Sequence, residues 1–381
     1  MPELTEIRNR INRIDQDITR LFLERMEATA QVADYKRATG KPVFDPARER
    51  ANIAAASKRV PPELASYAST LESVLMAASR DAQYRALGQE GTSGVALSRA
   101  LLEAPSAFPA AAHVACQGVE GAYQQIATER LFRRPTISYY GSFAQVFEAV
   151  EQGDAQFGVL PIENSTAGSV NQVYDLMMSH NFSIVRSCRL KIDHNLLVKP
   201  GTSKEDIRTV YSHQQALSQC SAYLATLPNC RPNICENTAI AAQTVAQSDD
   251  PTVAALASRA CADLYGLVIA EASVQDNQNN YTRFACIARD LTVYPGADRS
   301  SLMIVLKHEP GALYNVLSRF YALDINITKL ESRPIPGRDF EFMFYFDIEC
   351  PAVSPEFASL LNSMEIICED MRYLGSYAEV L

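Results

Sequence analysis

The first ninety residues carry basic side chains at spacings that could bind a small anion. An apolar seam follows a predicted helix in steps of three and four, through Leu4, Ile7, Ile11, Ile14, Ile18 and Leu21. Arg25 stands where the seam should continue, and Lys36 follows almost three turns further along the same face. A cation on an apolar seam is costly unless an anion meets it, although an arginine that extends its head into water would explain it as well.

Two further predicted helices would add polar groups to such a site. Asp45, followed by a proline, is typical of a helix N-cap, and the helix that it starts carries Arg48 and Glu49. A third helix places Ser79 and Gln83 on one face as an i, i+4 pair. Each pair alone is compatible with solvated surface, but the combination favours a site for an anion that also has hydrogen-bonding groups.

Polar residues also gather at the ends of predicted strands further along the chain. The segments are 163–166 (ENST), 212–215 (SHQQ) and 279–284 (NNYTRF). Near the C-terminus, a glycine turn at 307–313 precedes a helix, and 328–334 ends a strand with ESRP. An ordinary turn before a helix and an edge strand ended by proline would explain this last pair.

Periodicity divides the 381 residues into segments of different kinds. Residues 1–90 are predicted to be all helical, and 91–111, rich in small residues, to be a linker with at most one short helix. Residues 112–292 alternate strands and helices, as α/β domains do. Residues 299–381 follow the βαββαβ order of a ferredoxin-like fold.

Composition excludes several classes of protein. The chain is 47% hydrophobic with a net charge of −9, which excludes disorder and disfavours nucleic acids or anionic membranes as partners. Nine cysteines without CxxC or Cys/His clusters predict free thiols in a reducing compartment and no metal site. Because the N-terminus is charged and no apolar run approaches ~18 residues, we expect a cytoplasmic protein without a membrane span.

Residues 4–85 resemble the helical chorismate mutases, through IRNRINRIDQDITRLFLERMEATAQVADYK, DPARER and ASRDAQ. All of the family's substrate-binding positions are matched, by Arg8, Arg25, Lys36, Asp45, Arg48, Glu49, Ser79 and Gln83. The resemblance implies that the three arginines bind the carboxylates of chorismate and that Glu49 holds its ring hydroxyl. It assigns catalysis to Lys36 and Gln83, which would meet the ether oxygen.

Helix length adds a prediction about assembly. Arg8 and Lys36 are 28 residues apart, or ~42 Å along one straight helix. One small ligand cannot touch both, so Arg8 must reach the site from another subunit. We therefore expect an intertwined homodimer with shared mutase sites, which could assemble further into a higher oligomer.

Residues 112–290 resemble prephenate dehydratase through CQGVEGAY, LPIENSTAGSV, VYSHQQALSQC and NNYTRF. The resemblance implies a two-lobed, periplasmic-binding-protein-like α/β fold with the substrate between the lobes and no cofactor. Thr282 corresponds to the family's catalytic hydroxyl, and Glu163 is a candidate proton source. The implied substrate contacts are Glu163, Asn164, Ser165, Ser212, Gln219, Thr282, Arg283 and Phe284. Arg283 could equally make a structural ion pair, and two residues, Gln124 and Gln214, depart from the family's pattern.

The last segment resembles ACT regulatory domains of the phenylalanine-binding type, through its GAL and ESRP motifs. The implied effector-binding residues are Gly311, Ala312, Leu313, Glu331 and Ser332. In this order the three resemblances are those of the bifunctional P-protein family of phenylalanine biosynthesis. They imply chorismate and prephenate as substrates and L-phenylalanine as feedback inhibitor. The alternatives are an enzyme that prefers arogenate and, from another class, a metabolite-sensing protein without activity.

Overall fold

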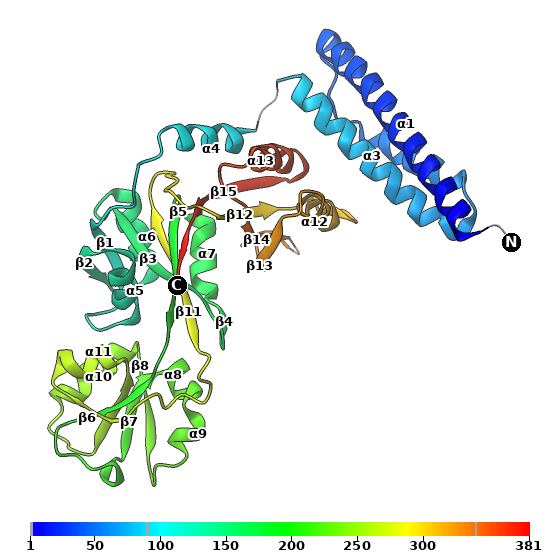
Figure 1. The fold of residues 1–381 in the computed structure, drawn as a ribbon. Coiled ribbons are helices and arrows are strands. Elements are labelled where there is room, and N and C mark those ends of the chain that lie inside the picture. The colour runs from blue at the N-terminus through cyan, green and yellow to red at the C-terminus, as the bar shows by residue number, and fades with distance from the viewer. Residues whose placement is uncertain (1–2, 89–90, 340) are drawn as a thin grey trace. The chain divides into compact units, whose positions relative to one another are not determined.

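A computed structural model describes residues 3–88, 91–339 and 341–381 of the chain. The chain forms two compact units, Met1–Thr92 and Ser93–Leu381. Helices and strands follow one another in the order labelled in Figure 1. Among the described residues, no helix is both long and apolar enough to cross a membrane.

The N-terminal unit consists of helices. They are α1 (Leu4–Thr39), α2 (Pro46–Lys58), the short 3-10 helix η1 (Pro62–Leu64) and α3 (Ala65–Ala86). Helix α1 is continuous, and it ends at Gly40, whose φ of 67° suits a residue without a side chain. The predicted N-cap is confirmed, because the Asp45 carboxylate accepts a hydrogen bond from the backbone N–H of Arg48. Helix α3 packs against both α1 and α2.

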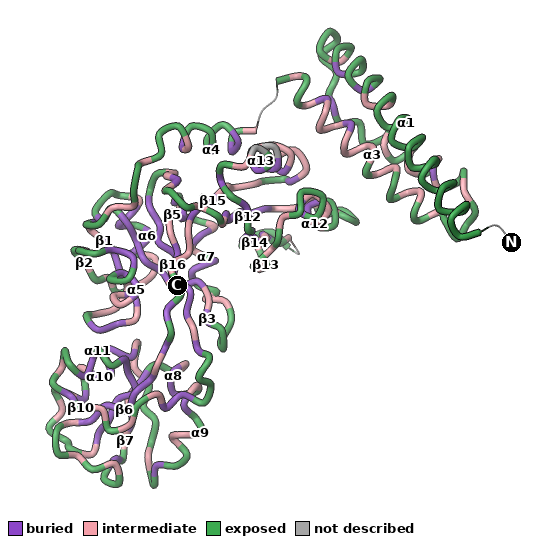
Figure 2. Tube along the Cα trace, viewed as in Figure 1, coloured by how far each residue is buried: buried purple, intermediate pink, exposed green. Residues whose placement is uncertain are grey.

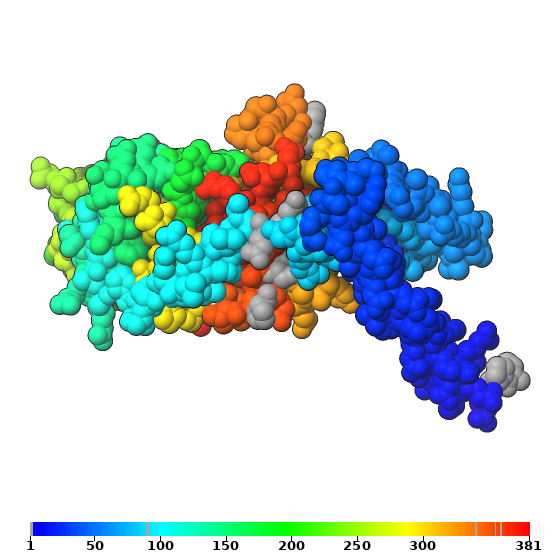
Figure 3. All heavy atoms as spheres, turned by 90° about the horizontal axis from the view of Figure 1, so that it is seen from above, coloured from blue at the N-terminus to red at the C-terminus, as the bar shows by residue number. Residues whose placement is uncertain are grey.

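The apolar seam of α1 is exposed within this unit. Its six residues, from Leu4 to Leu21, have exposed fractions of 42–61%, and the N-terminal half of α1 is drawn as exposed along its length in Figure 2. The first turns of α1, in dark blue, lie open on the face seen in Figure 3. Burial of apolar area is the main source of folding and association free energy, so an unburied seam of this length is a surface that a partner helix would stabilise.

The C-terminal unit contains three sheets. The first has the order β16-β5-β11-β3-β1-β2, with β4 paired to β3. Its strands are β1 (Ala111–Gln117), β2 (Arg134–Tyr140), β3 (Phe157–Asn164), β4 (Gly168–Ser169), β5 (Ser183–Lys191), β11 (Tyr281–Ala288) and β16 (Glu379–Val380). The helices α5 (Tyr123–Leu131), α6 (Phe143–Gln152) and α7 (Asn171–Ser179) pack against it.

The second sheet has the order β10-β6-β9-β7-β8. Its strands are β6 (Asn195–Val198), β7 (Thr209–His213), β8 (Arg231–Cys235), β9 (Val253–Ala257) and β10 (Val268–Glu271). The helical segments are η2 (Lys204–Asp206), α8 (Gln214–Gln219), α9 (Ser221–Leu224), α10 (Thr238–Gln247) and α11 (Arg259–Tyr265). The chain enters this sheet between β5 and β6 and leaves it between β10 and β11 (Figure 1).

The third sheet has the antiparallel order β13-β14-β12-β15. Its elements are β12 (Arg299–Val305), α12 (Ala312–Ala322), β13 (Asn326–Pro334), β14 (Phe342–Glu349), α13 (Pro355–Ile367) and β15 (Asp370–Tyr377). This is the βαββαβ order expected from the sequence. The sheet shares one hydrophobic core with the first, in which Met303, Tyr345 and Tyr377 lie with Ile184 and Ile287.

The segment expected to be a linker contains a packed helix, α4 (Thr92–Leu102). Its Leu97 and Ala100 are buried in the same core as Phe346 and Leu360 of the third sheet and α13. Gly94 of this helix lies so close to Asn362 that a Cβ atom at this position would clash with the amide oxygen. The small residues of this segment therefore allow α4 to lie against α13.

Candidate active sites

The N-terminal unit holds a cavity of about 840 Å³ lined by side chains of α1, α2 and α3. Seven of the eight predicted substrate-binding residues line it, namely Arg25, Lys36, Asp45, Arg48, Glu49, Ser79 and Gln83. Three separate helices therefore bring together the residues that the sequence singled out, and three of these residues are cationic. Such a cavity can bind an anion by bidentate and point-charge contacts.

Hydrogen bonds within this cavity hold its polar groups in place. The Arg25 guanidinium donates to the Ser79 hydroxyl and, over 3.0 Å, to the carbonyl of Leu75. Lys36 Nζ donates to the carbonyl of Val43 over 2.6 Å, and burial lowers the pKa of this ammonium. The buried Gln83 donates to the Ser79 carbonyl over 3.2 Å, while its Oε1 has no partner within the described chain.

Several residues that were not predicted also line this cavity, among them Arg80 and Asn52. Arg80 makes an ion pair with Glu49, so the carboxylate assigned to the ring hydroxyl already has a partner. Asn52 lies one helical turn beyond Arg48 and lines the same wall. The i, i+4 spacing could have indicated Asn52, whereas the pairing of Arg80 with Glu49 depends on how α2 and α3 pack.

Arg8 is not among the described residues that line the cavity. It lies exposed in the second turn of α1. Because α1 is one uninterrupted helix of 36 residues, the ~42 Å separation from Lys36 applies to the folded unit.

A second cavity, of about 450 Å³, lies where the first and second sheets meet. Four of the predicted dehydratase residues line it: Asn164, Gln219, Thr282 and Phe284. The Thr282 hydroxyl oxygen accepts a hydrogen bond of 3.0 Å from Asn164 Nδ2. The two residues are partners in the register of β3 and β11, which explains why distant motifs meet here.

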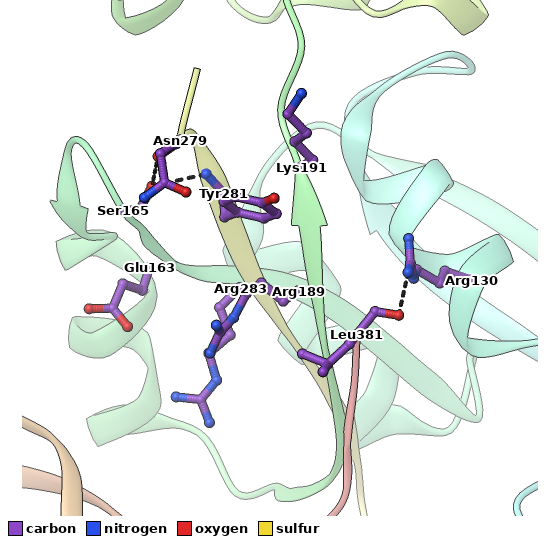
Figure 4. A pocket seen from close by; sticks show the side chains of 9 residues that line it. All are labelled: Arg130, Glu163, Ser165, Arg189, Lys191, Asn279, Tyr281, Arg283 and Leu381. Atoms are coloured by element: carbon purple, nitrogen blue, oxygen red, sulfur yellow. Dashed lines mark hydrogen bonds between the residues drawn. The ribbon is translucent and has the colours of Figure 1, made fainter. Parts of the chain in front are cut away.

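The other predicted contacts lie elsewhere, and alternation along the strands gives the reason. Successive side chains of a strand point to opposite faces, so the neighbours of Asn164 and Thr282 face away from this cavity. Glu163, Ser165 and Arg283 line a different cavity of about 740 Å³ (Figure 4). The pairing of β3 and β11 has a bulge directly after this point, because Arg283 pairs with Glu163 but the next residue, Phe284, pairs with Pro161.

Each of these misplaced residues has a partner of its own. Glu163 accepts a hydrogen bond of 2.7 Å from Lys329 Nζ on β13, so it is not positioned to donate a proton to a ligand beside Thr282. The Ser165 hydroxyl donates to the carbonyl of Asn279 over 2.9 Å. Ser212 is fully buried and donates to the carbonyl of Leu256 over 2.7 Å.

Arg283 makes the structural ion pair that the sequence left open. Its side chain is 9% exposed and pairs with Asp347 of β14 and, over 2.9 Å, with Glu379 of β16. It also donates to the Tyr377 hydroxyl over 3.0 Å. A guanidinium held by two buried carboxylates is not free to bind a substrate carboxylate.

Several residues of the cavity around Thr282 were not predicted, among them Tyr123, His194 and Glu236, whereas His213 lies in the polar segment 212–215. Burial lowers the pKa of His194, which is 3% exposed. Of the two departures from the family pattern, Gln124 is buried and lines this cavity, while Gln214 is exposed at the start of α8. Among the described residues, no group of three or more His, Cys, Asp or Glu side chains could hold a metal ion.

The expected effector residues occupy two elements of the third sheet. Gly311, with a φ of 83°, precedes α12, which begins with Ala312 and Leu313. Glu331 and Ser332 are consecutive on β13 and so point to opposite faces. The Glu331 carboxylate accepts a hydrogen bond from Ser169 of β4 and lies 3.6 Å from Lys329.

Comparison with known proteins identifies the class of two parts of the chain. A family model described as chorismate mutase type II matches residues 7–84, and one described as prephenate dehydratase matches residues 114–292. A relative from Escherichia coli (strain K12), named bifunctional chorismate mutase/prephenate dehydratase, is 34% identical over 98% of this chain and 96% of its own. The chain belongs to this family of bifunctional chorismate mutase/prephenate dehydratases.

Two other similar proteins cover the C-terminal unit. One, from Arabidopsis thaliana, is named arogenate dehydratase/prephenate dehydratase 2, and it is 38% identical over 69% of this chain and 72% of its own. The other is the crystal structure of a prephenate dehydratase in complex with L-Phe from Arthrobacter aurescens. It is 28% identical with a TM-score of 0.65, and the match covers 70% of this chain and 89% of that chain.

Proposed function

We propose that the chain converts chorismate to prephenate in the cavity of its N-terminal unit and prephenate to phenylpyruvate in the cavity around Thr282. The first reaction is a pericyclic rearrangement, which requires no nucleophile or proton donor. The protein has to hold the reactive conformer and stabilise the charge that grows on the ether oxygen. The cavity supplies Arg25 and Arg48 for the carboxylates and Lys36 and Gln83 for that oxygen.

Arg8 would complete this site from a second subunit. The proposal is supported by the exposed apolar seam of α1, which begins beside Arg8, and by the length of the helix. Two α1 helices that pair antiparallel, with the seam of each against residues 23–40 of the other, would bury both seams and bring Arg8 of each chain near Lys36 of the other. The assembly is therefore a homodimer with shared mutase sites, and a higher oligomer is compatible with it.

The observation that carries the dehydratase proposal is the placement of the Thr282 hydroxyl in the second cavity beside Asn164. In the reaction, the ring C–O bond breaks with its electron pair on oxygen, and a donated proton turns the leaving group into water. The bond to the ring carboxylate breaks as CO2 leaves, and its electron pair completes the aromatic ring. Thr282 donates the hydrogen bond to the departing oxygen, and the partly enclosed cavity disfavours a solvated carboxylate.

We further propose that the third sheet and its helices are an ACT domain through which L-phenylalanine inhibits dehydration. Support comes from the βαββαβ order, from the turn at Gly311 before α12, and from the relative solved with L-Phe. Glu331, the expected partner of the effector's ammonium, bonds Ser169 of β4, which pairs with β3 beside Asn164. An effector that takes Glu331 would remove this contact and so favour a different arrangement of the catalytic strands.

A specific observation keeps arogenate as a second candidate substrate. Glu236 places a carboxylate at the cavity around Thr282, and arogenate has an ammonium where prephenate has a keto group. Comparing kcat/KM for the two compounds, in the wild type and in Glu236→Gln, measures the preference. We expect prephenate to be the better substrate and Glu236→Gln to affect arogenate more.

The test of the proposed function is the formation of phenylpyruvate from chorismate by the purified protein. Chorismate consumption without phenylpyruvate would contradict the second site, and no consumption would contradict the first and favour a metabolite-sensing protein. A cytoplasmic location remains a prediction from the sequence.

A further inference from the structure

Three side-chain amides beside Thr282 form a closed ring of hydrogen bonds. Asn164 Nδ2 donates to Asn280 Oδ1 over 2.8 Å, and Asn280 Nδ2 donates to Gln219 Oε1 over 2.9 Å. Gln219 Nε2 donates back to Asn164 Oδ1 over 3.2 Å. Each amide therefore gives one hydrogen bond to the next and accepts one from the previous.

Backbone groups fix the direction of this ring, that is, which amide donates to which. Asn164 Oδ1 accepts from the backbone N–H groups of Thr166 and Ala167, over 3.1 and 3.0 Å, so this atom has to be the oxygen. On the other side, Asn164 Nδ2 donates to the backbone carbonyl of Tyr281 over 3.2 Å. Because an amide oxygen only accepts, the group facing Asn164 Oδ1 has to be the nitrogen of Gln219.

The direction of the ring determines which way the Thr282 hydroxyl points. Asn164 Nδ2 also lies 3.0 Å from Thr282 Oγ1, so its two hydrogens are shared among Asn280 Oδ1, the Tyr281 carbonyl and this hydroxyl oxygen. An amide NH₂ cannot accept, so the proton of Thr282 is directed away from Asn164 and is available to a ligand in the cavity. A catalytic hydroxyl that must donate to a leaving group benefits from a neighbour that only donates.

The direction of the ring also determines the tautomer of His194. Its Nε2 lies 3.1 Å from Gln219 Oε1, which can only accept, so Nε2 carries the hydrogen. Its Nδ1 lies 3.5 Å from the Tyr123 hydroxyl, which donates to the carbonyl of Asp193 over 2.7 Å. The Nε2–H tautomer of His194 is thus a signature of the ring's direction that does not involve activity.

Asn280 is the member of the ring that belongs to neither the substrate cavity nor a regular element. It is 1% exposed and lies just before β11, in the segment by which the chain returns from the second sheet. We propose that Asn280 is a positioning residue for dehydration: it closes the ring that holds Asn164 and leaves the Thr282 proton for the substrate. The inference rests on the proposed role of Thr282 as the donor.

Asn280→Asp tests the direction of the ring with almost no change of shape. The ionised carboxylate of this variant only accepts hydrogen bonds, so it repels Gln219 Oε1. We therefore expect kcat for prephenate at neutral pH to fall ~10- to 100-fold, a loss typical of supporting residues. KM should change less than kcat. Once protonated, the introduced carboxyl regains a donor, and burial raises the pKa of such a group. The activity of Asn280→Asp relative to the wild type should therefore rise as the pH falls, whereas that of Asn280→Ala should not.

Controls separate this role from a merely structural one. Asn279→Asp makes the same chemical change one residue away, beyond the ring, and should leave dehydratase activity unchanged. His194 can titrate as well, and Asn280→Ala reports its contribution to the pH profile, because this variant introduces no carboxyl group. In the wild type, ¹⁵N NMR of the five histidines, with His194→Gln to assign the signal, should give the Nε2–H form of His194.

The inference is overturned if Asn280→Asp turns over like the wild type at neutral pH, if its relative activity does not recover in acid, or if His194 is protonated on Nδ1 instead. The last measurement is made on the wild type, with only the assignment taken from His194→Gln, so it applies even where Asn280→Asp folds poorly. Failure of the proposed role of Thr282 as the donor would give a different result, because Thr282→Val would then retain full dehydratase activity. A collapse in Thr282→Val without any effect of Asn280→Asp would overturn the role of Asn280 alone.

Discussion

Thr282 and Arg283 are neighbours on β11, yet their side chains lie on opposite faces of the strand. The Thr282 hydroxyl lines the cavity between the first two sheets, while the Arg283 guanidinium is buried against Asp347 of β14, in the third sheet, and Glu379 of β16. The partners of these residues on β3 are divided in the same way, because Asn164 bonds Thr282 and Glu163 bonds Lys329. Two adjacent positions thus join the candidate active site to the part of the chain that resembles a regulatory domain.

Removing Asp347 should destabilise the C-terminal unit. Asp347→Ala leaves Arg283 buried with one carboxylate fewer, and breaking a buried ion pair costs about 3–5 kcal/mol. Denaturant unfolding, followed by a probe in this unit, measures the loss. The matched control is Asp290→Ala, which removes an exposed partner of Arg289 and should cost at most ~1 kcal/mol. Equal effects of the two variants would contradict a structural role for the buried pair.

Mutase sites shared between subunits predict complementation in mixed dimers. Arg8→Ala and Lys36→Ala homodimers should both lose nearly all mutase activity and keep dehydratase activity. After the two are mixed and refolded, heterodimers contain one intact site, so mutase activity should return. Arg10→Ala is the control, because position 10 lies about 200° around the helix from position 8, and this variant should stay active. Heterodimers that form but remain inactive would exclude the shared site.

Feedback by L-phenylalanine should depend on Glu331. Glu331→Ala should weaken both binding and inhibition, while turnover without the effector stays largely intact; the coupling at stake is typically ~1–3 kcal/mol. Calorimetry of L-phenylalanine binding and dehydratase assays measure the two effects separately. Glu356→Ala, on the exposed first turn of α13, is the control. If the same concentrations of L-phenylalanine inhibited Glu331→Ala and the wild type equally, the effector would bind elsewhere. A truncated variant that ends near residue 297 would be a weaker test. It lacks Tyr345 and Tyr377, which belong to the core of the first sheet, so removal of the third sheet would also disturb the catalytic part.

Local sequence signals predicted much of the fold. The spacing of Leu4 to Leu21 predicted α1, the Asp45-Pro46 pair marked the start of α2, and the strand and helix pattern of the last 80 residues gave the observed order. Composition did not indicate the packing of α4: the small residues predicted a linker with at most one short helix, whereas Leu97 and Ala100 of that helix are buried. Small residues are typical both of flexible segments and of close helix contacts, and only the packed structure distinguishes them.

The candidate sites were predicted less evenly, for a physical reason. Helix spacing indicated which candidate mutase residues share a face, since positions three, four, seven and eleven apart lie together, whereas the packing of α1, α2 and α3 decides which faces meet in the cavity. In a strand, alternate residues point to opposite faces, and the elements packed against each face decide which face meets the substrate. Asp347 is 64 residues beyond Arg283 and Lys329 is 166 beyond Glu163, so no local pattern indicates these partners. The motif ENST therefore contributed Asn164 but not Glu163 or Ser165 to the cavity.

The most direct measurement follows the products formed from chorismate by the wild type and by Thr282→Val. The substitution removes the hydroxyl at nearly constant volume, so the fold and the mutase reaction should persist. Loss of a positioned donor typically lowers the rate by ~10²–10⁴. We expect the wild type to form phenylpyruvate, while Thr282→Val consumes chorismate at the wild-type rate and accumulates prephenate. Phenylpyruvate formed by Thr282→Val at the wild-type rate would contradict the proposed role of this hydroxyl, because the site would then lie elsewhere.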